Sequence, residues 1–341
     1  MTKHLSDDHR RGALSRCWGT GFGPQIARYG IQAMTAALVA AVLLGSGNST
    51  WATEGEPDGS AREASAQATA TAQPEAEKES RAPAYTVEMT AEHTAQVSRS
   101  PYVAPTPSAD EHFVIGQTKG WPENPAIPPQ DLLAYQITDP AATGEKIRVV
   151  LTTGNHNTEH SGSWAFQGMV DFLISDEPEA AALRRKAVFY VYPLVNPDGR
   201  FTRQGRGNPE LAAAGIKDHN RVWHTSGEFT TIDIVTAAMR KDTGGSADYV
   251  LDFHSTSSNH FRVVKDFADS PYSQAITARD PTIKPHVLVG HPGQVRRWGA
   301  SEDGLGAGFS TSTEHSHAIS VERCLEIGRT YGLALYDVVV P

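Results

Sequence analysis

From about residue 132 onwards, short apolar runs typical of strands alternate with segments whose apolar residues recur at helical spacing. The strand-like runs are 132–138, 146–152, 187–195, 248–254, 286–290 and 308–313. The helical segments are 163–175, 229–241 and 318–340. Such alternation favours a mostly parallel sheet with helices packed on it. We therefore predict one α/β domain over residues 111–341, with a mostly parallel mixed central sheet flanked by helices.

The first 52 residues resemble an export signal in composition. Residues 1–30 are rich in Lys and Arg, and residues 31–45, IQAMTAALVAAVLLG, form an uncharged apolar run followed by small polar residues, Trp51 and Ala52. The run is shorter than the roughly 20 residues of a spanning helix, which favours a signal peptide over an anchor. We predict that residues 1–52 are a signal peptide or an N-terminal membrane anchor. If the protein is bacterial, we expect it to be exported to the periplasm or the extracellular space.

The next segment lacks the side chains that a core needs. Residues 53–82 contain almost no large apolar residues, so they cannot bury enough surface to offset the entropy lost on ordering. Residues 83–110 are rich in Pro, Ser and Thr. We predict a disordered linker over residues 53–110.

The charge of the chain limits its partners. The formal net charge is −9, whereas nucleic-acid-binding proteins normally present a basic face. We therefore predict no nucleic-acid partner, and membrane contact only through an uncleaved N-terminal segment. Once residues 1–52 are removed, Cys324 is the one remaining cysteine, so no internal disulfide can form, and we expect it to be a buried helix residue.

Metal-binding residue types follow two of the predicted strands. In GNHNTEH, residues 154–160, His156 and Glu159 are three positions apart, which places both side chains on one side of a helix start. His254 ends the strand DYVLDFH, on the same face as Asp252. Two imidazoles and a carboxylate leave a fourth zinc position open, as at catalytic sites. An HxxE pair also arises readily by chance in a chain with 14 histidines, so an ordinary polar loop is the alternative.

Two further polar segments lie between these motifs. NPDG, residues 196–199, is predicted to be a turn, because Pro, Asp and Gly favour turn positions. DHNR, residues 218–221, offers two adjacent donors, and an arginine fork fits a carboxylate in bidentate fashion.

The order HxxE, NPDG, arginine, DxNR and DxH resembles the zinc carboxypeptidase family, which includes the pancreatic and cytosolic carboxypeptidases, over roughly residues 112–340. The resemblance implies that family's fold and one Zn²⁺ per chain, held by His156, Glu159 and His254. It also implies that Asp218 orients the first ligand histidine.

The resemblance further implies a clamp, an oxyanion-stabilising arginine and a glutamate base. Asn220 and Arg221 would hold the C-terminal carboxylate of the substrate. Arg206 best matches the arginine by its distance after NPDG, and Arg200 and Arg203 are the alternatives. The base would be Glu314, which follows a β-branched run, or Glu322, which lies in a segment of helical periodicity; Glu314 is favoured.

Residues 291–308 depart from the family pattern, because they contain no tyrosine where the family often places one on a mobile loop. Either Trp298 or His291 would then contact the substrate, or the contact would be missing. Within this stretch, Glu302 or Asp303 would favour a basic C-terminal residue of the substrate, whereas Arg296 or Arg297 would favour an acidic one. A second departure is His219, which stands where an apolar residue is usual. His315 and His317 are expected to be polar loop residues.

The resemblance therefore implies a zinc metallocarboxypeptidase. It would hydrolyse the C-terminal bond of peptides that carry a free carboxylate, with metal-activated water and a glutamate base. The alternatives are a murein peptide amidase or peptidase, and a zinc deacylase of the succinylglutamate desuccinylase or aspartoacylase type. An inactive exported binding module is the alternative outside enzymes.

Overall fold

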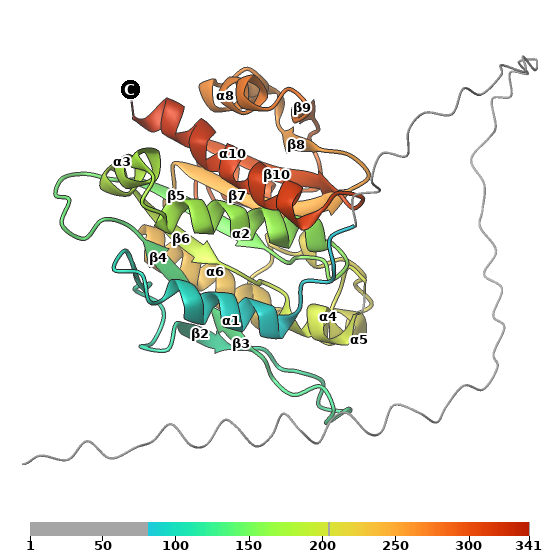
Figure 1. Cartoon of the computed structure of the whole chain (residues 1–341). Helices are drawn as coiled ribbons and strands as arrows, with labels where there is room; N and C mark the ends of the chain where they lie inside the picture. The colour runs from blue at the N-terminus through green and yellow to red at the C-terminus, as the bar shows by residue number, and fades with distance from the viewer. Residues whose placement is uncertain (1–80, 204, 341) are drawn as a thin grey trace, which may run out of the picture. The chain divides into compact units, whose positions relative to one another are not determined.

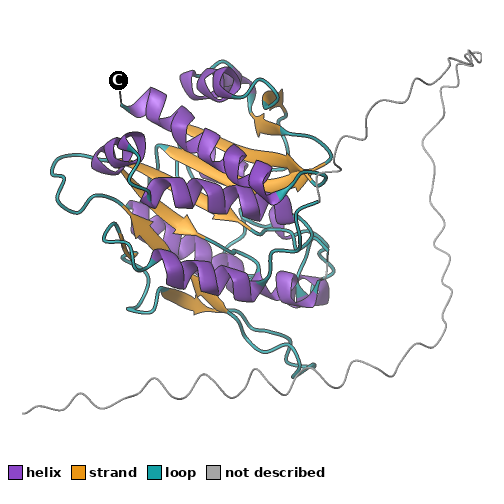
Figure 2. Cartoon of the chain, viewed as in Figure 1, coloured by secondary structure: helices purple, strands orange, loops and turns teal. Residues whose placement is uncertain are grey.

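The computed structural model describes residues 81–203 and 205–340, so the predicted signal or anchor and residues 53–80 of the predicted linker lie outside the described residues. Eight strands form one sheet in the order β1-β4-β6-β5-β7-β10-β8-β9 (Figures 1 and 2). In that order they are Val103–Pro105, Tyr135–Ile137, Ala187–Tyr192, Ile147–Thr153, Tyr249–Thr256, Phe309–Ser316, His260–Val263 and Lys284–Val287. A separate hairpin pairs β2 (Val114–Gln117) with β3 (Asp131–Leu133).

The helices are α1 (Val87–Val97), α2 (His160–Ile174), α3 (Pro178–Lys186), α4 (Pro197–Thr202), α5 (Pro209–Ala213), α6 (Thr230–Thr243), α7 (Lys265–Ala268), α8 (Pro271–Arg279), α9 (Val295–Ala300) and α10 (Val321–Val339). A short 3₁₀ turn, η1, spans His219–Arg221. None of the helices in these two described ranges is long and apolar enough to span a bilayer.

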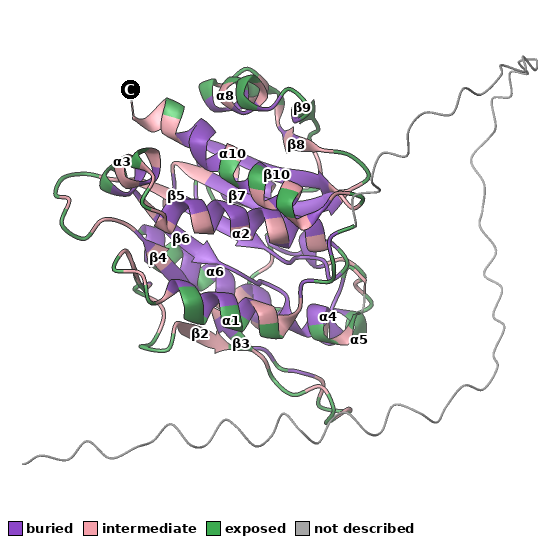
Figure 3. Ribbon diagram, in the orientation of Figure 1, coloured by how far each residue is buried: buried purple, intermediate pink, exposed green. Residues whose placement is uncertain are grey.

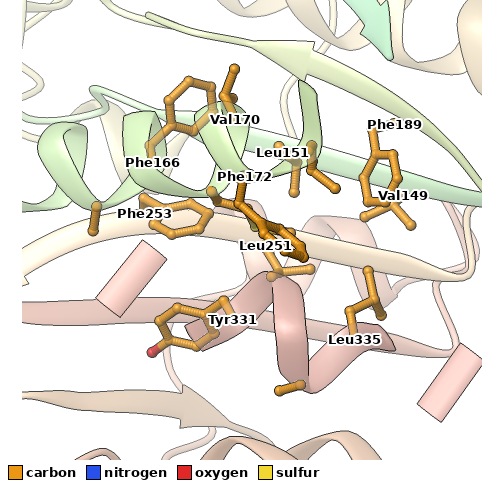
Figure 4. Packing of buried hydrophobic residues seen from close by; sticks show 14 of the residues in the cluster. Val149, Leu151, Phe166, Val170, Phe172, Phe189, Leu251, Phe253, Tyr331 and Leu335 are labelled. Atoms are coloured by element: carbon orange, nitrogen blue, oxygen red, sulfur yellow. The ribbon is translucent and has the colours of Figure 1, made fainter. Parts of the chain in front are cut away.

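The four central strands β6, β5, β7 and β10 are parallel. β4 pairs antiparallel with β6 and with β1, and β8 pairs antiparallel with β10 but parallel with β9. Helices cover both faces, so the central strands are buried on both sides (Figure 3). Along β7, Leu251 and Phe253 face the core under α2 and α10 (Figure 4). Val250 faces the second core, which contains residues of α6 and α9. The predicted α/β fold with a mixed, mostly parallel sheet is confirmed.

The prediction that the linker extends to residue 110 is wrong. Residues 87–97 form α1, whose N-cap Thr86 accepts a hydrogen bond from the Met89 amide, and Val97 is fully buried. β1 then pairs with β4. The segment is poor in large apolar residues, but an N-cap, a few buried side chains and strand pairing order it against the rest of the domain.

His315 is a core residue, not the polar loop residue that we expected. It follows Glu314 on β10, so it points to the opposite face of the sheet, between the rings of Phe253 and Tyr331. The side chain is fully buried, and burial lowers the pKa of His315 to about 3. His317 lies beyond the strand and is only partly buried.

The buried imidazole should make the protein sensitive to acid. Below about pH 6.5 the unfolded chain protonates His315, while the folded chain does not until the pH nears its lowered pKa. The unfolded state therefore binds more protons, and the free energy of unfolding should fall by up to about 1.4 kcal/mol per pH unit as pH decreases from 6.5 towards 3. His315→Phe should flatten this slope in urea titrations. Replacing His112, whose side chain is 78 % exposed, should not, and equal slopes for His315→Phe and wild type would contradict the assignment.

Candidate active site

Polar side chains cross one face of the sheet in two adjacent rows, toward the carboxyl ends of β7 and β10. In-register partners on neighbouring strands share a face, and so do residues two positions apart. The first row is His254, Glu314 and His260. The second row is Asp252, Ser312 and Arg262. The register therefore places a predicted metal ligand beside a predicted base.

The loop after β5 brings His156 and Glu159 to the end of the first row. His160 is the first residue of α2, as expected, and α2 packs closely on β7 at Gly162. A Cβ at position 162 would lie 2.5 Å from the His254 carbonyl oxygen, so only glycine permits this approach. The ligand atoms of His156, Glu159 and His254 consequently lie within 4.8 Å of one another, and all three side chains are buried.

A carboxylate anchors each of the two histidines. Nε2 of His156 lies 2.9 Å from Asp218, and Nε2 of His254 lies 2.5 Å from Asp252. The Nδ1 atoms of the two rings face Glu159, at 2.7 and 2.6 Å. A ring that donates its Nε2–H to a carboxylate keeps Nδ1 as a lone-pair donor for a metal.

Asp252 is a residue whose role the sequence analysis missed. It accepts hydrogen bonds from Thr152 Oγ1 at 2.8 Å and Asn155 Nδ2 at 2.9 Å, which fix its orientation toward His254. The two-residue period had already placed it on the face of His254. A metal-bound imidazole needs an acceptor for its second N–H, and that requirement was the available signal.

The donor set fits zinc. Burial alone would raise the pKa of Glu159, but the imidazoles of His254 and His156 outweigh it and hold the pKa well below its usual range. Glu159 is thus a carboxylate between two nitrogen donors. Two imidazoles, one carboxylate and anchored second nitrogens are the features of a catalytic zinc site with an open position.

Glu314 and Glu322 lie in different surroundings. Glu314 is buried and lines a cavity of about 70 Å³ together with the three metal-ligand candidates. Burial raises the pKa of Glu314, although Arg262 Nη1 lies only 3.1 Å from its Oε1. Glu322 lies in the first turn of α10 and is exposed. The structure therefore brings Glu314, and not Glu322, to the metal-ligand candidates.

The three candidate arginines lie in different places relative to the cavity. Arg206 lines the cavity, with Nε 2.9 Å from Asp218 and Nη1 3.3 Å from Glu159 Oε1, and its side chain is 49 % exposed. Arg200 is buried, and it donates to the Tyr85 carbonyl and to Ser163 Oγ. NPDG is the start of α4, not the predicted turn, with Asn196 as its N-cap, and Arg203 lies exposed at the end of that helix.

The predicted clamp residues lie at the edge of this cavity. Asn220 lines it, and its Oδ1 accepts a hydrogen bond from the Val295 amide at 2.8 Å. Arg221 is 37 % exposed, and its Nη1 donates to the Asn220 carbonyl oxygen at 2.8 Å. Arg221 is not a wall residue of the small cavity.

Burial and exposure distinguish the remaining residues that the sequence singled out. Trp298 packs on Trp223 in the core beside α6, so the alternative in which Trp298 contacts the substrate is wrong. His219 is fully buried and has Nδ1 3.0 Å from Asn155 Oδ1, which explains a polar residue at a position where an apolar one is usual. Cys324 is buried on α10, as expected. His291 is exposed on the loop before α9.

Comparison with known proteins identifies relatives of this fold and motif set. The model of the family described as zinc carboxypeptidase matches residues 129–230. Human cytosolic carboxypeptidase 6 is 32 % identical over 147 residues, which cover 41 % of this chain and 28 % of that protein. Human cytosolic carboxypeptidase 2 is 40 % identical over 93 residues, covering 26 % of this chain and 10 % of that protein. The chain therefore matches less than a third of the length of these relatives.

The fold is also shared with solved structures. A metallo-carboxypeptidase from Burkholderia cenocepacia superposes with a TM-score of 0.60 at 17 % identity, over 74 % of this chain and 69 % of that one. At this identity the likeness concerns the fold. Because the family match covers the segment that carries HxxE, NPDG and DHNR, and the fold supplies His254 beside them, the chain belongs to the zinc carboxypeptidase family.

Proposed function

We propose that the protein is a zinc-dependent carboxypeptidase that removes the C-terminal residue of peptides, with Glu314 as general base. One observation carries this proposal. His156, Glu159 and His254, which could hold a metal, share one small buried cavity with Glu314 and Arg206.

The side chains divide the chemistry among them. When bound, zinc would polarise the scissile carbonyl and make a water molecule more acidic. Glu314 accepts the proton of the attacking water and delivers it to the amine as the C–N bond breaks. The raised pKa of Glu314 suits a base that must also return the proton. Arg206, half-exposed at the cavity, donates to the developing oxyanion.

Removal of one terminal residue requires recognition of the free carboxylate. Asn220 lines the cavity, and Arg221 beside it uses only Nη1 in hydrogen bonds among the described residues. Its remaining donors form a planar fork available to a carboxylate. A substrate held there places its last peptide bond, and no internal one, near Glu314.

Amidation of the substrate tests this clamp. An N-acetylated tripeptide with a free C-terminus should be hydrolysed, and the same peptide with a C-terminal amide should react about 10- to 100-fold more slowly or not at all, as expected for the loss of a charged hydrogen-bonded pair. Arg221→Ala should weaken cleavage of the free acid by a similar factor and leave the slow amide unchanged. Equal rates for acid and amide in the wild type would contradict the clamp.

The same hydrolysis assay with other substrates distinguishes two related activities. A murein peptidase would cleave peptidoglycan stem peptides in preference to ordinary peptides. A deacylase of the aspartoacylase type would cleave N-acylated amino acids in preference to tripeptides. Export from the cytoplasm, proposed from the N-terminal sequence alone, suits the murein alternative.

A further inference from the structure

A short segment before α1 is fixed on the helix that follows the metal-ligand loop. Residues 82–86, which we call the strap, belong to no helix or strand. Tyr85 is buried, its hydroxyl donates to Gln167 Oε1 at 2.9 Å, and its ring packs edge-on against Trp164 with the ring centroids 4.8 Å apart. Trp164 Nε1 in turn donates to the Pro83 carbonyl oxygen at 3.1 Å. These contacts hold the strap against the first half of α2.

The backbone of the strap is bonded to the end of the loop that carries two metal-ligand candidates. We call residues 155–160 the ligand loop. The Tyr85 amide donates to His160 Nδ1 at 3.2 Å, and the Tyr85 carbonyl oxygen accepts a hydrogen bond from Arg200 Nη1 at 2.5 Å. His160 directly follows Glu159, so the first of these bonds acts on the neighbour of a metal-ligand candidate.

Arg200 joins the strap to the ligand loop. Its side chain is buried, and its Nη2 donates to Ser163 Oγ at 3.1 Å and lies 3.5 Å from the His156 carbonyl oxygen. Its Nη1, which donates to the Tyr85 carbonyl, also lies 3.2 Å from His160 Nδ1. A guanidinium donates from a rigid planar fork, so one arginine can fix the strap, the ligand loop and α2 relative to one another.

A preformed loop should bind metal more tightly than a mobile one. A loop whose ligands already lie together loses little conformational entropy when the ion binds. If the loop instead sampled other conformations, only a fraction of the molecules would present His156 and Glu159 side by side, and the apparent affinity would fall by that fraction. The bonds from Tyr85 and Arg200 restrain the backbone at both of these positions or next to them.

We infer that Arg200 and Tyr85 are positioning residues for the metal site, and that the strap holds the ligand loop ready for Zn²⁺. The inference rests on the zinc site of the proposed function. It adds to that site a segment that lies 75 residues before His160 in the chain, and it gives Arg200 a role away from the oxyanion.

Zinc affinity of full-length variants tests the inference. The Kd for zinc is measured by competition with a chromophoric chelator, at a temperature well below the Tm of every variant. Tyr85→Ala and Arg200→Gln should each raise this Kd by about 10-fold, the lower end of the effect of residues that orient a metal ligand. Tyr85→Phe keeps the ring on Trp164 and the backbone bonds, so it should retain the wild-type Kd.

Tyr272 and Arg184 provide matched controls, because they are buried side chains of the same types that bond elsewhere. Tyr272 Oη donates to the Tyr331 carbonyl oxygen, and Arg184 Nη1 donates to the carbonyl oxygens of Leu173 and Ser175. Tyr272→Ala and Arg184→Gln should lower the Tm of the metal-free protein but leave the zinc Kd unchanged. A loss of stability alone does not alter the Kd while nearly all molecules remain folded.

Hydrogen exchange of the wild type gives a second measurement that needs no variant. Zinc should slow amide exchange in the ligand loop and in the strap together, but not in α8, because only segments that open as one unit share protection. If Tyr85→Ala and Arg200→Gln do not fold, this comparison still decides.

The outcomes separate this inference from the proposed function. If the wild type binds zinc but both variants keep its Kd, or if zinc protects the ligand loop without the strap, the inference is wrong and the function stands. If both variants lose affinity but no peptide is hydrolysed by the wild type, the inference stands and the carboxypeptidase function fails. A wild type that binds no zinc would overturn both.

Discussion

Replacing Glu314 with glutamine should lower kcat of the zinc-loaded enzyme by about two to four orders of magnitude, the usual contribution of a general base. Glutamine has the same size but cannot accept the proton of the attacking water. Glu314 is buried in the cavity wall, and glutamine fills the same volume. The shape of the cavity should therefore be preserved, and KM should change little. Steady-state kinetics on the preferred tripeptide give both constants.

Glu322 provides the matched control. It differs from Glu314 in being exposed on the first turn of α10, although both glutamates were candidates for the base. Glu322→Gln should leave kcat within a factor of about 2, as for a surface substitution remote from the site. If Glu314→Gln kept wild-type kcat, or if Glu322→Gln lost activity, the assignment of the base would be wrong. Zinc content should be equal in both variants.

The strand ends are the part of the site that a sequence predicts best. Local spacing and the end of an apolar run indicated the metal-ligand candidates His156, Glu159 and His254. Parallel strands bring their carboxyl ends to the same edge of a sheet, so these residues were expected to lie together. Glu314 follows for the same reason. Helical periodicity around Glu322 already indicated that it lies on a helix, where it faces solvent.

Other features depend on packing between distant segments. The burial of Arg296 depends on α9 lying over β7 and β10, because a sequence does not show which arginines become buried. Trp298 was one of the alternatives for a substrate contact, but it lies in the second core against Trp223. α1 was not predicted because threonines and a histidine, together with Val97, form its buried face. Most of these residue types are polar, so the composition of the segment did not indicate a buried helix.

Removing one metal ligand should have the second large effect. The wild type should bind about one zinc per chain, and His254→Ala should lose nearly all of it at micromolar metal, because a three-ligand site cannot hold zinc with two. His254 is also the ligand that joins the sheet to the loop bearing Glu159. Zinc content after dialysis, measured by atomic emission, and the zinc-dependent rise in Tm both report the loss without an activity assay.

Two further variants on the same polar rows serve as comparisons for the zinc affinity of His254→Ala. His260 lies in the first row on the far side of Glu314 and outside the ligand set, so His260→Ala should retain one zinc. Asp252→Asn keeps the shape but weakens the acceptor for His254, and it should reduce zinc affinity by about 10- to 100-fold, as is typical for a residue that orients a ligand. Retention of wild-type zinc affinity by His254→Ala would exclude this metal site. The order wild type, Asp252→Asn, His254→Ala in falling affinity is expected only if the ion sits between His156, Glu159 and His254, because only there does Asp252 act through a ligand.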